Sequence, residues 1–471
     1  MQTKIVYSLL AGTLLFFSVL SCKQTPTNGN EPTQTNDSTV ATHRLPSPEW
    51  TRNATIYEVN VRQFSEEGTF KAVEQQLTRL REMGVDILWL MPIHPISKEN
   101  LQGTAGNPYA VEDYKAVNPE YGTMADFKAF VKQAHDLGMH VILDWVPNHT
   151  GRSHSWVKQH PDWYTKINGK LSAPIDDQGR VTNRPDVVDL NYQNPELRAA
   201  MIDAMQFWIR ECDVDGYRCE VAGFVPDDFW AELRPKLDRI KPVFMLAEWE
   251  DKPEHFKECF NMNYGWSAFQ LMQQIAKGKR PATALDSLLA HNKQRFPPWY
   301  YQMHFTQNHD ENAWTGTGSE LFGNGIDAFT VLAFTFDGMP LVYNGMESNL
   351  SKRLKFYEKD PIYWGNYAKA EFYKTLLTLK HRNRALWNGQ AGGELMKIPT
   401  EKDDKVYAFY RKQDNDQIVV IVNLSPTPQT IRLNGDGFEG VFTEVFSREP
   451  AELRNSLTFA LKPWEYKVYT N

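Results

Sequence analysis

Two glutamates in this 471-residue chain could share the work of breaking a covalent bond. Glu220 lies in the strand-like run 214–222, two residues after Arg218, so alternation along a strand would point both side chains to the same face. A guanidinium beside a carboxylate keeps the carboxylate ionised and oriented, as a nucleophile requires. Glu248 ends another apolar run and precedes Trp249, whose ring would favour the protonated form that a general acid needs.

Two further polar clusters also follow apolar runs. In chain order they contain Asp144, Asn148, His149, His309 and Asp310. One acid at the end of a buried strand is usually a helix cap or an ion-pair partner, and one histidine is often a buried structural imidazole. Four clusters at four strand ends are harder to explain in this way, so we interpret them together as one candidate active site.

The elements that must position these residues alternate between strands and helices. Strands are predicted at residues 54–61, 85–92, 139–144, 214–222, 242–248, 258–263, 301–307 and 340–344. Helices are predicted at residues 71–83, at 126–137 behind a Thr123 cap, and from Pro195 to about residue 210. Eight such alternations predict an α/β fold, a closed (β/α)8 TIM barrel with the clusters at its C-terminal end. An open, doubly wound sheet is the structural alternative.

The chain is expected to contain two further structural units. The barrel should span residues 46–388, with an inserted subdomain at about 150–194 after the third strand, because connections of that length are usually functional. After residue 389 the pattern changes to strands without helices. Residues 389–471 therefore predict a C-terminal antiparallel β domain, a small β-sandwich.

Taken in order, the four clusters resemble the motifs of the α-amylase family of glycoside hydrolases, family 13. The resemblance runs from about Thr55 to the end of the chain. Three further stretches support it, at Gly106 to Tyr114, Val188 to Asn191 and Gly338 to Gly345. It implies an enzyme that hydrolyses α-1,4-linked glucans, such as starch and maltooligosaccharides, with retention. The reaction would be a double displacement through a covalent glycosyl-enzyme.

The resemblance also implies a role for each candidate residue. Glu220 occupies the nucleophile's place, Glu248 would be the general acid/base, and Asp310 would hold sugar hydroxyls and stabilise the transition state. The remaining residues would bind the substrate or support the nucleophile. Tyr109 would stack under the sugar ring, and His149 and His309 would bond its hydroxyls. Asp144 and Arg218 would support the nucleophile, and Trp249 would line the site. Plain packing is the alternative for both aromatic residues.

Glu220 is the first departure from the family pattern, which has aspartate at this position. The longer side chain would shift the carboxylate by about 1 Å, and a misplacement of that size can cost about a hundredfold in rate. The backbone could be adjusted so that Glu220 attacks normally, the site could be slowed, or the chain could be an impaired glucan-binding homologue. A 4-α-glucanotransferase with the same site is a further alternative, because only the acceptor differs.

A second departure concerns metal binding. Many α-amylases carry Lys-His after the nucleophile, where the histidine helps to hold calcium, but this chain has Gly223 to Pro226 there. Asn148 and Asp189 match calcium-ligand positions and offer hard oxygen donors. A structural calcium site is therefore left open, and the chemistry itself requires no cofactor.

The beginning of the chain predicts export. Residues 1–21 combine Lys4 with a short apolar run, which is typical of a signal peptide. The run ends in Val-Leu-Ser-Cys, which resembles a bacterial lipobox and predicts a lipidated Cys22, anchored to a bacterial membrane through a flexible tether at 22–45. An ordinary signal peptide is the alternative. The net charge of -7 gives no basic footprint for nucleic acid, and we expect a monomer that binds an α-glucan.

Overall fold

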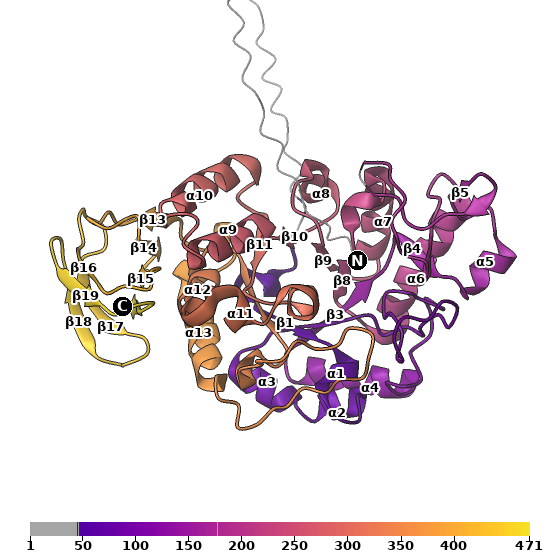
Figure 1. The fold of residues 1–471 in the computed structure, drawn as a ribbon, viewed down its shortest axis with the longest axis horizontal. Helices are drawn as coiled ribbons and strands as arrows, with labels where there is room; N and C mark the ends of the chain where they lie inside the picture. Colours follow the sequence, from indigo (N-terminus) through magenta and orange to yellow (C-terminus); the bar gives the residue numbers. More distant parts are fainter. Residues whose placement is uncertain (1–44, 46, 177) are drawn as a thin grey trace, which may run out of the picture. The chain divides into compact units, whose positions relative to one another are not determined.

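The computed structural model describes residues 45, 47–176 and 178–471. Eight parallel strands close into a barrel in the order β1-β12-β11-β10-β9-β8-β3-β2 (Figure 1). The strands are β1 (Ile56–Val59), β2 (Ile87–Leu90), β3 (His140–Trp145), β8 (Gly216–Cys219), β9 (Phe244–Ala247), β10 (Met262–Tyr264), β11 (Tyr301–His304) and β12 (Met339–Tyr343). The predicted closed barrel is confirmed, and the open-sheet alternative is wrong.

Helices surround the barrel strands. They are α1 (Val61–Phe64), α2 (Phe70–Glu74), α3 (Leu77–Met83), α4 (Met124–Asp136), α6 (Pro195–Cys212), α7 (Asp227–Asp238), α8 (Pro253–Glu258), α9 (Trp266–Ala276), α10 (Ala284–Arg295), α11 (Gly318–Phe322), α12 (Ile326–Thr335) and α13 (Ala370–Arg382). The cap expected at Thr123 is confirmed, because Thr123 and Asp126 form a reciprocal capping box. The single helix expected at 71–83 is wrong, since Gln76 N–H bonds the carbonyl of Val73 and the tightened turn separates α2 from α3.

An insertion lies between β3 and α6. It contains β4 (His149–Gly151), α5 (Ser155–Gln159), β5 (Lys166–Ile167), β6 (Lys170–Leu171) and β7 (Val187–Asp189). Strand β4 pairs antiparallel with β7, which brings His149 opposite Asp189. The second half of the insertion therefore returns to the end of the third barrel strand.

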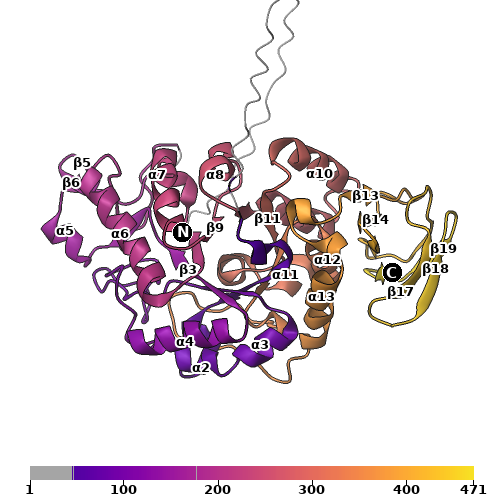
Figure 2. The ribbon, with the colours of Figure 1, turned by 180° about the vertical axis from the view of Figure 1, so that it is seen from behind.

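The C-terminal part of the chain is antiparallel β structure. A six-stranded sheet has the order β13-β14-β15-β20-β17-β18, and β16 pairs with β19. The strands are β13 (Leu395–Lys397), β14 (Val406–Gln413), β15 (Asp416–Asn423), β16 (Gln429–Arg432), β17 (Gly440–Glu444), β18 (Pro450–Leu453), β19 (Thr458–Leu461) and β20 (Tyr466–Thr470). These strands lie beside α10, α12 and α13, on the side of the barrel opposite α5 and β5 (Figures 1 and 2).

A buried arginine fastens the C-terminal sheet to the barrel. Arg411 of β14 donates to the carbonyls of Thr335 and Phe336 at the end of α12. It also donates to the carbonyls of Gly393 and Trp387. One side chain thus bonds four backbone carbonyls, two at the end of α12 and two in the segment that precedes β14.

The described residues include no helix long and apolar enough to cross a membrane. The predicted signal peptide, the predicted lipidation site at Cys22 and almost all of the tether lie outside the described residues.

Candidate active site

Arg218 stands at the centre of the polar cluster inside the barrel. It is fully buried on β8, and its guanidinium donates to Asp144 Oδ1 at 2.9 Å, to Glu248 Oε1 at 2.8 Å and to the hydroxyl of Tyr264 at 3.1 Å. Carboxylates from the two strands that flank β8 are therefore held by one cation. The charges of Asp144 and Glu248 outweigh burial and keep the pKa of Arg218 well above its ordinary value.

Asp144 supports this arrangement from the end of β3. Besides Arg218, it accepts hydrogen bonds from the hydroxyl of Tyr109 at 2.9 Å and from the indole of Trp89 at 3.2 Å. Burial raises the pKa of Asp144 to about 6, although Arg218 opposes the increase. With its carboxylate fully occupied by protein donors, Asp144 positions its neighbours.

Glu220 lies in a different environment from the one its spacing predicts. Strand β8 ends at Cys219, so Glu220 is the first residue of the turn, and its Oε2 has no hydrogen-bond partner among the described residues. Burial, followed by the charge of Glu248, raises the pKa of Glu220 to about 8. The charge of Arg218 lowers the pKa of Glu220, as its spacing predicts, but the ion pairs that Arg218 forms are with Asp144 and Glu248.

Glu248 is held by two donors. One is Arg218, and the other is the backbone N–H of Val221, which lies 2.7 Å from Glu248 Oε2. Val221 adopts a left-handed conformation with φ 37° and ψ 47°. This conformation is unfavourable for a β-branched residue, and such strain is concentrated at functional sites. Here the strained turn directs an N–H group at the predicted general acid/base.

A hydrogen-bonded chain continues from Asp144 to the other side of the barrel. Tyr109 accepts from His309 Nε2 at 2.9 Å, and His309 Nδ1 pairs with Glu58 on β1. His309 Nε2 also lies 3.4 Å from Asp310, whose side chain is 39% exposed and open to a substrate. Although burial lowers it, the charges of Asp310 and Glu58 raise the pKa of His309 to about 9. His309 is thus a cation at neutral pH.

Glu58 is a site residue that the sequence did not predict. It stands within the apolar strand β1, is completely buried, and pairs through Oε1 with His309, while its Oε2 has no hydrogen-bond partner among the described residues. The sequence signal for it is one acid in a buried strand, which equally fits a structural ion pair.

His149 is a neutral imidazole that lies next to the backbone of Tyr109. Its Nε2 is 3.2 Å from the carbonyl of Tyr109, and its Nδ1 has no partner among the described residues. Burial lowers the pKa of His149 to about 3. A buried ring nitrogen without a protein partner is suited to bond a sugar hydroxyl.

The calcium ligands that the sequence suggested do not form a complete site. Burial raises the pKa of Asp189 to about 6, and the buried Nδ2 of Asn148 has no hydrogen-bond partner among the described residues. The described residues contain no group of three or more His, Cys, Asp or Glu side chains arranged to hold a metal. Asn148 and Asp189 offer three side-chain oxygens, fewer than the six to eight oxygens that calcium takes, so we assign no role to the ion.

Aromatic side chains border the cluster. Tyr109 is buried and stacks on His309, with ring centroids 5.7 Å apart. On the other side Trp249 packs against Phe224, and Gly223 makes room for it, since a Cβ there would lie 2.2 Å from the indole ring. The glycine that departs from the family pattern therefore lets an aromatic ring approach beside Glu248.

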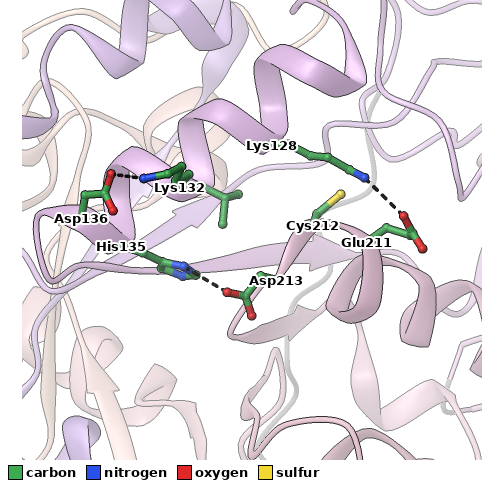
Figure 3. Close-up of a pocket in the computed structure, with 8 residues that line it drawn as sticks. Lys128, Lys132, His135, Asp136, Glu211, Cys212 and Asp213 are labelled. Carbon is green, nitrogen blue, oxygen red and sulfur yellow. Dashed lines mark hydrogen bonds and ion pairs between the residues drawn. The ribbon is translucent and has the colours of Figure 1, made fainter.

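The structure brings the candidate residues to one end of the barrel. Contacts link all three proposed catalytic groups with Tyr109, Asp144, His149, Arg218 and His309, and Trp249 adjoins Glu248 along the chain. An open groove between α4 and α6 is lined by none of them (Figure 3). Its charged residues pair with one another, as in Lys132 with Asp136.

A family model described as the alpha amylase catalytic domain matches residues 31–176 and 181–370. The chain belongs to the alpha-amylase family of glycoside hydrolases. A second model, the C-terminal domain of maltogenic amylase, matches residues 396–468. The family match covers both strand-end glutamates and every other candidate in the barrel.

Similar proteins match most of the chain in sequence and in structure. Alpha-amylase MalA of Haloarcula japonica is 28% identical over 423 residues, which cover 85% of this chain and 60% of that protein. The chain thus spans three fifths of that relative. A noncanonic maltogenic alpha-amylase from Thermotoga neapolitana has a TM-score of 0.78 at 29% identity, covering 89% of this chain and 98% of that structure. An alpha-amylase from Lactobacillus plantarum has a TM-score of 0.75 at 29% identity, covering 89% and 99%.

Proposed function

We propose that this protein hydrolyses α-1,4-linked glucans, such as starch and maltooligosaccharides, with retention of anomeric configuration. The observation that carries the proposal is the pair of Glu220 and Glu248 at neighbouring strand ends. Glu220 Oε2 has no donor among the described residues, and Glu248 is held by Arg218 and Val221. The names of the similar proteins support the substrate class, since they include alpha-amylases and a maltogenic alpha-amylase.

The proposed reaction has two displacements. In the first, Glu248 gives its proton to the glycosidic oxygen while the carboxylate of Glu220 attacks the anomeric carbon, so that the bond to the leaving sugar breaks and an ester to Glu220 forms. In the second, water attacks the same carbon, returns a proton to Glu248 and releases Glu220. The charge of Glu248 helps to raise the pKa of Glu220, so the two glutamates titrate as a coupled pair, and attack requires the proton of the pair to be on Glu248.

The surrounding residues would hold the reacting sugar ring. Asp310 and the charged His309 offer an acceptor and a donor to hydroxyls, His149 offers an unpaired ring nitrogen, and Tyr109 offers a ring for stacking. Asp144 would keep Arg218 in place throughout.

A glucan-binding protein without turnover is the second candidate. It is favoured by the raised pKa of Glu220 and by the lack of a hydrogen-bond partner for Glu220 Oε2 among the described residues. Release of reducing ends from a soluble linear α-1,4-glucan separates the two candidates. The same assay on Glu220→Asp and Glu248→Gln shows what each glutamate does, and NMR of the first product shows its anomeric configuration.

Glu220 is supported as a working nucleophile if the unaltered protein is active, Glu248→Gln loses activity and Glu220→Asp is no more active than the unaltered protein. Activity of Glu220→Asp alone would identify an impaired site. No release from either would overturn hydrolysis of this linkage, and products longer than the substrate would identify a 4-α-glucanotransferase.

We further propose that the protein is exported and attached to a bacterial membrane through a lipid on Cys22. The support is the sequence Val-Leu-Ser-Cys after a short apolar run. Cys22→Ser should move the protein from the membrane fraction to the soluble fraction of the producing cell. An unchanged distribution would refute the lipid anchor.

A further inference from the structure

A run of aromatic rings leads from the catalytic cluster to the protein surface. Tyr109 is nearly parallel to Phe356, with ring centroids 6.1 Å apart and planes 17° apart. Phe356 packs against Trp314 at 5.2 Å, and Tyr357 lies 5.6 Å from the same indole. Trp314 is 43% exposed, so part of its ring surface is available to a ligand. Large amphipathic rings of this kind suit the apolar faces of sugars.

The surface ring is held rigidly to the site. Trp314 belongs to η3 (Glu311–Thr315), a π-helical turn that begins directly after Asp310. Buried Asn312 in that turn donates to the carbonyl of Lys352 at 3.1 Å and accepts from the N–H of Leu354 at 2.9 Å. The loop that carries Phe356 is thus fixed to the turn that carries Trp314. Such pre-organisation lowers the entropic cost of binding.

The position of the rings in the barrel indicates which part of a glucan they meet. Glu248 protonates the leaving group, so the reducing-end part of the substrate lies on the side of Glu248 and Trp249, after β9. Trp314 follows β11 and Phe356 follows β12, and in the closed barrel β12 lies across from β8. The part of a glucan that extends past Tyr109 toward these rings is therefore its non-reducing end.

We propose that Trp314, together with Phe356 and Tyr357, forms a stacking platform for the glucose unit next to the catalytic ring on its non-reducing side. The inference rests on the proposed function and adds a specificity to it. Substrates with at least two glucose units on the non-reducing side of the cleaved bond are preferred, and the first product released from the glycosyl-enzyme is maltose or longer.

Trp314→Ala tests the platform with two chromogenic substrates that differ by one glucose unit. With 4-nitrophenyl α-maltoside, KM should rise about tenfold at nearly unchanged kcat, because stacking on a unit remote from the cleaved bond is lost equally in ground and transition states. With 4-nitrophenyl α-glucoside, which lacks that unit, kcat/KM should be unchanged. Trp314→Phe should recover most of the lost affinity.

A matched control is Tyr363→Ala, which removes an aromatic ring that is 86% exposed and, among the described residues, is not in ring contact with Trp314, Phe356 or Tyr357. It should change neither substrate. A retained maltoside KM in Trp314→Ala, or an equal loss on both substrates, would overturn the platform.

Binding without turnover separates failure of this inference from failure of the proposed function. In a Glu248→Gln background, maltopentaose binding measured by calorimetry should weaken about tenfold on Trp314→Ala and stay constant on Tyr363→Ala. If the unaltered protein turns over no glucan but this dependence is observed, the hydrolase is refuted and the platform stands. Equal binding by both variants would refute the platform even in an active enzyme.

Discussion

The pH dependence of hydrolysis tests how the two catalytic glutamates share their proton. Retaining attack needs Glu220 ionised and Glu248 protonated, so the coupled pair is competent only while it holds one proton. The pKa of Glu220, about 8, sets the pH at which this proton is lost. We expect kcat/KM to fall above that pH, to about one tenth of its plateau at about pH 9 and about one hundredth at about pH 10.

The assay is the initial rate of reducing-end release from maltopentaose, from about pH 5 to about pH 10 at constant ionic strength. Maltopentaose has no titrating group in this range. The fall of kcat/KM at high pH, which is the alkaline limb of the profile, therefore reports a group of the free protein. Arg184 is exposed, and its charge lowers the pKa of Glu220. Arg184→Gln should therefore move the limb to higher pH, and Arg184→Lys should leave it in place.

His309 must be distinguished from Glu220, because Asp310 and Glu58 raise the pKa of His309 to about 9. Glu58→Gln removes an anion and should lower the pKa of His309 without moving the limb that belongs to Glu220. The reasoning is refuted by a limb below about pH 6, or by a limb that Glu58→Gln moves and Arg184→Gln does not.

Three further changes have defined outcomes. Between about pH 4.5 and 8, Glu220 is ionised in the unfolded chain but not in the folded protein, so the stability of the folded protein falls as pH rises through this window. The increase in Tm caused by Glu220→Gln should therefore be larger at about pH 8 than at about pH 5. An equal increase at both pH values would contradict the raised pKa of Glu220. Glu58→Gln should lower the pKa of His309, as measured by NMR of the imidazole ring, and should raise KM because His309 would bind sugar hydroxyls more weakly. If the pKa of His309 did not change, Glu58 would have no role in the site. Arg411→Met removes hydrogen bonds to four backbone carbonyls and should cost about 3–5 kcal/mol in urea unfolding. Arg432→Met at an exposed position should cost about 0.5 kcal/mol or less.

The barrel could be predicted because its signals are local. Apolar runs ending in polar clusters mark buried parallel strands, and Thr123 carries its capping partner three residues away. The clusters could be placed together because parallel strands in a barrel share one C-terminal end. The prediction of one helix at 71–83 failed, since helical spacing of apolar residues continues through the tightened turn at Gln76.

The partners within the site could not be predicted from local patterns. Alternation places Arg218 and Glu220 on one face only while the strand continues, and β8 ends at Cys219. The guanidinium of Arg218 binds Asp144 on β3 and Glu248 at the end of β9, and both of these carboxylates are distant from Arg218 in the sequence. Glu58 was missed for a related reason, because its partner His309 is distant in sequence and meets it only when the barrel closes.

Closure of the barrel has a consequence for how the protein folds. Strand β1 pairs with β12 on one side and with β2 on the other. The first barrel strand to be synthesised therefore keeps one edge unpaired until β12, the last barrel strand, has been synthesised. Such non-local pairing slows folding and leaves a strand edge open to association with other chains. The contact between Glu58 and His309 forms across the same seam. Recovery of catalysis during refolding should therefore follow the closing of this seam and lag behind the recovery of helical structure.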